Sequence, residues 1–330
     1  MHTQKTYAQG TLTGWLNEYR SETILALVIV LTFAIGPLFT AYFLTPDNLF
    51  NLSRQGSYLG IVTVGMALVL IVGGIDLSIG AIMQLVGLCT VLMLGAGVSA
   101  SAAFIFALLM GAGLGIVNGI LSVYVGMQPF IATLATGGIM TGIVTTYTQG
   151  NAIAPRGIDP LFKAIGGGTV AGVPVPAAVM LLIVVVFGWI MSNTVYGKNL
   201  YALGSNKMAA GIIGMNTRLV ECSVYVVSGT LAALAGYLTF ARMGTFQPET
   251  AATGGTPVEM VIMAVAAVVL GGGSLTGGKG TIAGAFLGAL LSAILLNFLV
   301  LLGMGIWFQR FILALIIILV VVSARRSEGA

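Results

Sequence analysis

The chain has 330 residues, of which 58% are hydrophobic and only 7% are charged, and its mean hydropathy is +1.07. A soluble globule of this size needs more ionisable side chains than this to cover its surface. The composition therefore predicts an all-α protein that crosses a membrane many times. The net charge of +4 is explained by basic residues that anchor at the inner membrane face. No aromatic and basic stripe is present, which argues against nucleic-acid binding.

About ten transmembrane helices are expected in a single domain over residues 24–324, with at least one of them broken. The hydrophilic start, residues 1–23, lacks an apolar core followed by a small-residue cleavage site, so we expect no cleaved signal peptide there. Residues 1–23 and 325–330 are interpreted as tails. The apolar stretches, in chain order, are 24–44, 58–72, 79–95, 100–124, 127–148, 170–191, 219–241, 257–275, 281–302 and 308–324.

The distribution of Lys and Arg predicts the orientation, because short loops rich in these residues resist translocation. The loop from Ser192 to Thr217 and the Arg325-Arg326 pair carry basic residues with no compensating acids nearby. Basic residues on the other side, such as Arg54, are loosely matched by acids. Both tails are therefore expected in the cytoplasm.

Residues 73–80, Gly-Gly-Ile-Asp-Leu-Ser-Ile-Gly, interrupt an apolar run from Leu59 to Leu94 that is too long for one crossing. Asp76 is the only charge in this run, and an ionised carboxylate among lipid tails costs roughly 2.5 to 3.5 kcal/mol. The segment therefore predicts a helix, a break and a second helix. Asp76 or Ser78 could cap the second helix, or the broken backbone could line a conduit for a solute.

Other polar side chains lie in the apolar stretches near a glycine-rich span and near the bend at Pro129. Polar groups inside a bundle either tie helices together or contact a solute. The candidates for a translocation pathway are Asp76, Ser78, Asn118, Gln128, Phe130, Thr133 and Thr136.

Glycines that recur at every fourth residue form smooth stripes, which let helix backbones approach closely in lipid. We interpret these stripes as helix-packing faces and assign them no ligand. One stripe holds Gly111, Gly115 and Gly119, and the other holds Gly280, Gly284 and Gly288.

The segment from Gly273 to Thr281 nearly matches a phosphate-binding loop, but Gly280 stands where a magnesium-binding hydroxyl is required. It also follows an apolar span instead of a strand, so we interpret it as a tight cytoplasmic turn in which Thr281 caps the next helix. The two cysteines, Cys89 and Cys222, are far apart, and the single histidine lies in the N-terminal tail. No metal site, cofactor or enzymatic chemistry is expected.

The loop at 192–218 contains a short predicted helix, which Ser205 or Asn206 can cap and Gly214 can end. It would form a small, exposed, mildly apolar plug bordered by cations. Such a plug suits a groove on a partner, and a plain connecting helix is the alternative.

Four segments occur in order: residues 73–80, Pro129 to Leu134, the loop at 199–216, and Gly271 to Gly284. Together they resemble sugar-type ABC importer permeases, most closely the ribose permease group, from about Asn48 to Val322. The resemblance implies a topology like that of the vitamin B12 importer, in a bacterial inner membrane. It also implies a second permease subunit, identical or different, a separate ATP-binding cassette ATPase, and an extracytoplasmic sugar-binding protein. The predicted ATPase-docking residues are Gly204, Ser205, Asn206, Lys207, Ala209, Ala210 and Gly214.

The chain departs from this family where many sugar permeases carry Glu-Leu-Asp, because residues 261–263 are Val-Ile-Met. Glu259 lies two residues early, so ribose cannot be assumed, and other pentoses, hexoses, polyols or signalling furanoses remain open. A heterodimeric permease is also open. The competing functions are an ion-coupled secondary transporter that uses Asp76, Glu221 and Glu259, and a membrane enzyme, for which no nucleophile and base are found.

Overall fold

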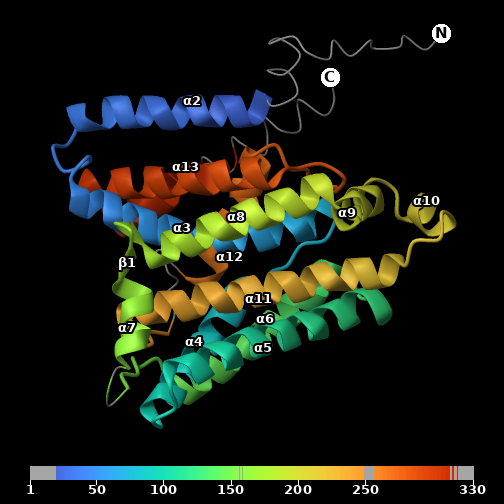
Figure 1. The fold of residues 1–330 in the computed structure, drawn as a ribbon, viewed down its shortest axis with the longest axis horizontal. Coiled ribbons are helices and arrows are strands. Elements are labelled where there is room, and N and C mark those ends of the chain that lie inside the picture. Colours follow the sequence, from blue (N-terminus) through green and yellow to red (C-terminus); the bar gives the residue numbers. More distant parts are fainter. Residues whose placement is uncertain are drawn as a thin grey trace.

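The computed structural model describes residues 20–155, 157, 159–248, 256–312, 314–315 and 318, and it is a bundle of helices (Figure 1). The first half contains α2 (Arg20–Ile35), η1 (Gly36–Leu38), α3 (Pro46–Ile71), α4 (Ile79–Gly95), α5 (Ala100–Gly119), η2 (Ile120–Tyr124), α6 (Pro129–Thr148) and α7 (Pro160–Gly167). The second half contains β1 (Thr169–Val170), β2 (Val173–Pro174), α8 (Val175–Asn193), α9 (Val195–Ser205), α10 (Lys207–Ile212), α11 (Thr217–Met243), α12 (Pro257–Leu270) and α13 (Ile282–Leu301).

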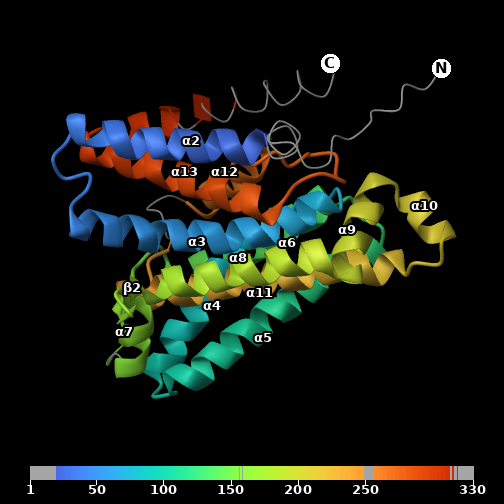
Figure 2. The same cartoon turned by 45° about the horizontal axis from the view of Figure 1, so that its top comes forward.

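The long helices run along a common direction, so the bundle has two ends (Figures 1 and 2). The α10 end carries α9, α10 and the glycine-rich loop 271–281, which is tied to α9 by a hydrogen bond from the Tyr201 hydroxyl to the Gly280 carbonyl. The α7 end carries α7 and the antiparallel pair β1–β2. At this end the Asp159 carboxylate accepts from the backbone N–H groups of Ala100 and Leu161, so one side chain caps both α5 and α7. These hydrogen bonds hold the pKa of the Asp159 carboxyl below its usual value.

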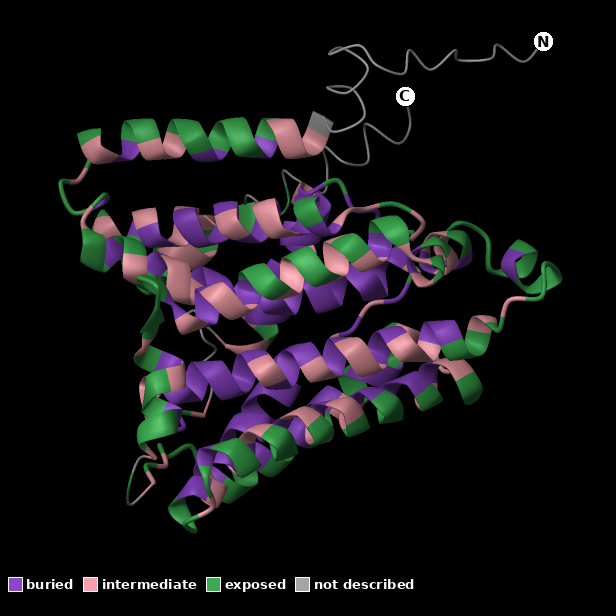
Figure 3. Cartoon of the chain, viewed as in Figure 1, coloured by how far each residue is buried: buried purple, intermediate pink, exposed green. Residues whose placement is uncertain are grey.

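The core lies along α3, α4 and α11, which are buried over most of their length (Figure 3). The fully buried aromatic rings of Tyr58, Tyr225 and Tyr237 belong to α3 and α11. The outer faces of α2, α5, α6 and α8 expose large apolar side chains, for example Leu109 and Leu182. Helices that are apolar on their outer faces suit contact with lipid, where every backbone polar group must be paired within the protein.

Among the described residues, seven helices are long and apolar enough to span a membrane, in agreement with an all-α polytopic membrane protein. Two more of the expected spans, 79–95 and 257–275, coincide with the shorter apolar helices α4 and α12, which are not among these seven. The tenth, 308–324, lies largely outside the described residues, although 306–312 are helical.

Helices α4 and α12 begin inside the thickness of the bundle. Their 17 and 14 residues give lengths of about 25 and 21 Å at 1.5 Å per residue. Both lengths fall short of a hydrocarbon core of about 30 Å. Their N-termini meet, because a Cβ on Gly80 would lie 2.2 Å from the carbonyl oxygen of Pro257.

The two glycine stripes lie at close helix contacts. Added Cβ atoms on Gly111 and Gly115 would lie 2.3 Å from the Ala233 side chain and from the Tyr225 carbonyl, both on α11. On α13, a Cβ at Gly288 would lie 2.0 Å from the carbonyl oxygen of Ala267 on α12. Gly119 meets Cys222 and Gly284 meets Gly271. Gly280 does not belong to a helix face, because it precedes α13 in the loop 271–281, where it meets Gly273. Larger side chains at these contacts would push the helices apart.

The predicted break at 73–80 is confirmed, since α3 ends at Ile71 and α4 begins at Ile79. Four span boundaries were wrong. The span predicted at 24–44 ends at Leu38, the last residue of η1. The span predicted at 58–72 begins at Pro46, the one predicted at 170–191 begins after the β1–β2 pair, and the one predicted at 257–275 ends at Leu270. The first turns of α3 were not predicted as part of the span because they contain polar residues. Helix α12 ends earlier than predicted because a glycine turn follows it, in which Gly272 has φ of +86°.

Candidate functional site

Asp76 is completely buried in the segment between α3 and α4, and hydroxyl groups surround its carboxylate. Its Oδ1 accepts from the Ser78 backbone N–H at 3.0 Å and from the Ser78 hydroxyl at 2.5 Å. Its Oδ2 accepts from the hydroxyl of Ser228, on α11, at 2.9 Å. Among the described residues, no Lys or Arg pairs with this carboxylate. The charge is therefore satisfied by neutral donors alone.

The hydrogen bonds continue from Ser78 into α5 and α6. Asn118 donates through Nδ2 to the Ser78 hydroxyl at 2.7 Å, and the Thr136 hydroxyl donates to Asn118 Oδ1 at 2.6 Å. We call these five residues, Asp76, Ser78, Asn118, Thr136 and Ser228, the Asp76 network. It joins the start of α4 to three other helices, and Ser228 lies 152 residues from Asp76 in sequence.

Thr133 fixes the broken segment from a second side. Its hydroxyl accepts from the Leu77 backbone N–H at 3.0 Å and lies 2.9 Å from the Pro129 carbonyl, to which it can donate. The Ser78 side chain makes no cap of its own on α4, and Asp76 instead binds the backbone N–H of Ser78. Among the described hydrogen bonds, neither predicted residue accepts from an N–H group of α4 itself, so the predicted cap does not form and Asp76 instead holds the residue that precedes the helix.

The structure brings together five of the seven predicted pathway residues. Asp76, Ser78, Asn118 and Thr133 are buried, and Thr136 is partly buried. Gln128 and Phe130 are exposed at the start of α6 and do not join the network. Sequence reasoning missed Ser228, whose only signal was a hydroxyl placed in an apolar helix.

Helix α10 is a short capped helix that projects from the bundle (Figures 1 and 2). Asn206 caps it by accepting from the Ala209 backbone N–H at 3.0 Å, and Gly214 turns the chain with φ of +86°. Lys207 forms an ion pair with Glu221 on α11. Ala210 is buried on the inner face of α10. These predicted docking residues thus build the loop through contacts within the chain.

Three large apolar residues are exposed on the outer surface of this loop, and we call them the α10 tip. Met208, Ile212 and Ile213 are 79%, 80% and 77% exposed. Sequence reasoning recognised the mildly apolar plug but did not single out these three residues. The signal for them was the spacing of apolar residues beside the buried Ala210.

Gly204 and Ser205, also predicted to dock, lie instead at a junction of three segments. A Cβ on Gly204 would lie 1.8 Å from the Ile71 carbonyl and 2.6 Å from the Gly278 backbone nitrogen. Gly278 donates to that carbonyl at 2.8 Å. We call this contact among α3, α9 and the loop 271–281 the glycine junction. The segment that resembled a phosphate-binding loop is a turn packed against its own chain, and Thr281 caps α13 by accepting from Gly284.

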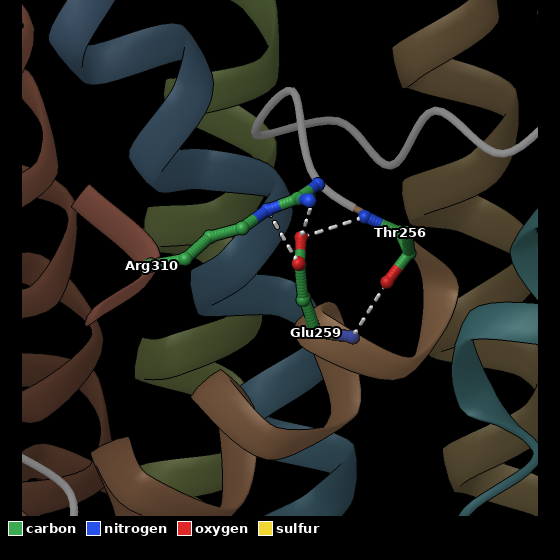
Figure 4. Close-up of polar contacts among 3 residues, drawn as sticks. All are labelled: Thr256, Glu259 and Arg310. Atoms are coloured by element: carbon green, nitrogen blue, oxygen red, sulfur yellow. Dashed lines mark hydrogen bonds and ion pairs between the residues drawn. The ribbon is translucent and has the colours of Figure 1, made fainter. Parts of the chain in front are cut away.

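A second polar cluster lies at the start of α12 (Figure 4). Thr256 and Glu259 form a capping box, with hydrogen bonds of 3.3 and 2.8 Å between side chains and backbone. The carboxylate of Glu259 also pairs with Arg310, whose Nε lies 2.7 Å from Oε1. The Arg310 guanidinium lies 4.9 Å from the ring centroid of Trp307. Within the described residues, no group of three His, Cys, Asp or Glu side chains could hold a metal ion.

Comparisons with known proteins agree on one family. The family model described as branched-chain amino acid transport system, permease component, matches residues 48–321. The ribose import permease protein RbsC of Escherichia coli is 37% identical over 317 residues, which cover 96% of each chain. RbsC of Bacillus subtilis is 38% identical over 305 residues, 92% of each chain.

A third relative carries a different sugar in its name. The D-allose transport system permease protein AlsC of Escherichia coli is 33% identical over 310 residues, which cover 94% of this chain and 92% of the relative. No solved structure gives a significant match.

Proposed function

Because the chain belongs to the family of ABC importer permeases, we propose that it forms the translocation pathway for a monosaccharide or related small polyol and couples it to a separate ATPase subunit. The chain itself is a permease and not an enzyme. The observation that carries the coupling proposal is the α10 tip. Three large apolar side chains are exposed in a loop bordered by cations, and such a surface gains stability when a partner covers it.

The rest of the assembly follows from the same proposal. The α10 end faces the cytoplasm and docks the ATPase. The α7 end faces an extracytoplasmic binding protein, and a second permease subunit completes the pore. The membrane is the bacterial inner membrane.

An ion-coupled secondary transporter is the alternative, and the contacts of its three acids weigh against it. Asp76 is enclosed by hydroxyl donors, Glu221 pairs with Lys207, and Glu259 pairs with Arg310. A carboxylate that carries a coupling ion must exchange its partners with water during each cycle. Asp76 has no exposed surface through which to do so.

The test is co-purification of the ATPase after gentle detergent extraction. Met208→Glu together with Ile213→Glu should reduce the bound ATPase at least about tenfold, because a carboxylate buried in an apolar contact costs more than the 1.4 kcal/mol that tenfold represents. These positions are preferable to Lys207 and Ala210, whose replacement would also disturb α10 itself.

The control is Val170→Glu, which introduces one carboxylate, against two in the double variant, at a 61% exposed site in β1 at the opposite end. This variant should retain the ATPase. Unchanged co-purification in the double variant would contradict the docking proposal. Uptake into liposomes driven by an ion gradient, with this chain alone, would support the secondary transporter instead.

A further inference from the structure

The Glu259–Arg310 pair lies deep within the bundle. Glu259 is 11 residues from Leu270, the last residue of α12 at the α10 end, so it lies about 16 Å along the helix axis from that end. This distance places it near the middle of a hydrocarbon core of about 30 Å. The contact between Pro257 and Gly80 agrees, because α4 also begins inside the bundle.

The pair is nevertheless open to the surface of the chain. The side chains of Arg310 and Glu259 are 32% and 30% exposed. Charged groups that face lipid at this depth are costly even when paired, and they mark water-filled paths in membrane proteins. The neighbouring Val258 and Trp307 are 65% and 76% exposed, so the surface around the pair is apolar. A charged pair in the middle of an apolar protein surface indicates that this surface lines a path for a polar solute.

The geometry of the pair leaves hydrogen-bonding capacity unused. The capping box holds Glu259, and the indole of Trp307 supports the guanidinium from one side. Of the five N–H donors of an arginine, Arg310 donates to Glu259 through Nη2 at 3.4 Å, while Nε lies 2.7 Å from Oε1 but makes no hydrogen bond among the described residues. Within the described part of the chain, no group accepts from Nη1. Among the described residues, the planar guanidinium therefore keeps donors that no protein group accepts from.

We propose that Glu259, Arg310 and Trp307 form a binding site for the hydroxyl groups of a neutral polyol passing along the pathway. The free guanidinium donors and the carboxylate lone pairs bind neighbouring hydroxyls, and the exposed indole packs on the C–H face of the sugar ring. The site is arranged for neighbouring hydroxyls and a ring C–H face, both of which an aliphatic α-amino acid such as leucine lacks. This inference rests on the proposed function and adds the chemistry of cargo contact to it.

The three tryptophans of the chain allow a direct test. In a Trp15→Phe, Trp189→Phe background, Trp307 is the only indole, and its fluorescence reports on the site in full-length protein held in lipid nanodiscs. D-ribose and D-allose, added to about 100 mM to cover a millimolar dissociation constant, should give a saturable change. Leucine should give none.

Two substitutions separate cargo contact from a purely structural tie. Arg310→Gln should abolish the saturable response. Arg310→Lys keeps the charge and the pair with Glu259 but loses the planar fork, so it should weaken the response at least about tenfold while leaving the thermal unfolding midpoint unchanged. A structural tie predicts the wild-type response in Arg310→Lys.

The inference is overturned by a linear response to sugar or no response at all, by an equal response in Arg310→Gln, by the wild-type response in Arg310→Lys, or by saturation with leucine alone. None of these bears on ATPase co-purification, which tests the importer proposal independently. If the ATPase binds and sugar uptake persists while Trp307 does not respond, only the polyol site fails. If the ATPase is absent in all variants, the importer proposal fails instead.

Discussion

Asp76 shows how a single carboxylate can be held inside a membrane protein without a cation. Its acceptors are satisfied by the Ser78 backbone N–H and by the hydroxyls of Ser78 and Ser228. Hydrogen bonds to a charged group contribute about 1.5–3 kcal/mol each, more than bonds between neutral groups. The residue therefore acts as an anchor that fixes where α4 begins, and any part in transport works through that position.

At the residue scale, Asp76→Asn should lower the free energy of unfolding by about 2 kcal/mol, the worth of one charge-assisted bond. The amide oxygen can still accept from Ser78, but the NH2 group then faces the Ser228 hydroxyl, which must rotate to accept. The measurement is unfolding by SDS in mixed micelles. Ser292→Ala is the control, because the Ser292 hydroxyl bonds only to Gly288 in its own helix and should matter less.

The same Asp76→Asn variant should retain its ATPase partner and take up sugar more slowly, since the start of α4 is less firmly placed. An uptake rate equal to wild type would remove Asp76 from the transport mechanism and leave it a purely structural role. Stability equal to wild type would contradict the anchor itself.

At the scale of elements, the sequence correctly predicted those helix ends that are determined by contacts between residues close together in the chain. The cap at Asn206 and the turn at Gly214 define α10, and both were readable from residue type alone. The start of α3 was not, because its polar residues find partners elsewhere in the chain. Asn48 and Asn297 exchange side-chain hydrogen bonds of 3.0 and 2.8 Å, and Arg54 donates to the Gly167 carbonyl. These polar side chains suggested a loop in the sequence, but in the fold they form hydrogen bonds with residues far away in the chain.

The glycine junction makes a prediction at this scale, because it connects α9 to the end of α3 just before the broken segment. Gly204→Ala should destabilise the protein by about 1–3 kcal/mol, since the new methyl meets backbone atoms that cannot rotate away. Thermal unfolding and the rate of ATP hydrolysis by the assembled transporter would both be measured. The hydrolysis rate should respond less to loaded binding protein.

Gly211→Ala provides the matched control. No atom lies within 4 Å of a Cβ at Gly211, and alanine favours the helix, so this variant should be neutral or slightly stabilising. Equal behaviour of the two variants would show that the junction tolerates separation and transmits nothing.

At the scale of the whole molecule, composition and the apolar stretches sufficed for the class of fold, while the site required long-range contacts. The Asp76 network closes through Ser228, and the Glu259–Arg310 pair joins segments 51 residues apart. Nothing in the sequence near Asp76 or Glu259 identifies these partners. The same holds for the α10 tip, whose exposed residues became distinct from the buried Ala210 only once α10 was placed beside α11.

The orientation of the bundle is the remaining prediction at this scale, and it follows from the charge at its two ends. Lys198, Lys207, Arg218 and Lys279 lie at or near the α10 end, which should therefore remain in the cytoplasm. With Cys89 and Cys222 replaced by alanine, Met208→Cys and Val170→Cys place a single exposed thiol at each end. A membrane-impermeant maleimide should label the Val170 site in spheroplasts and the Met208 site only after lysis. The reverse pattern would put the α10 tip outside the cell, where no ATPase could reach it, and would overturn the coupling proposal along with the orientation.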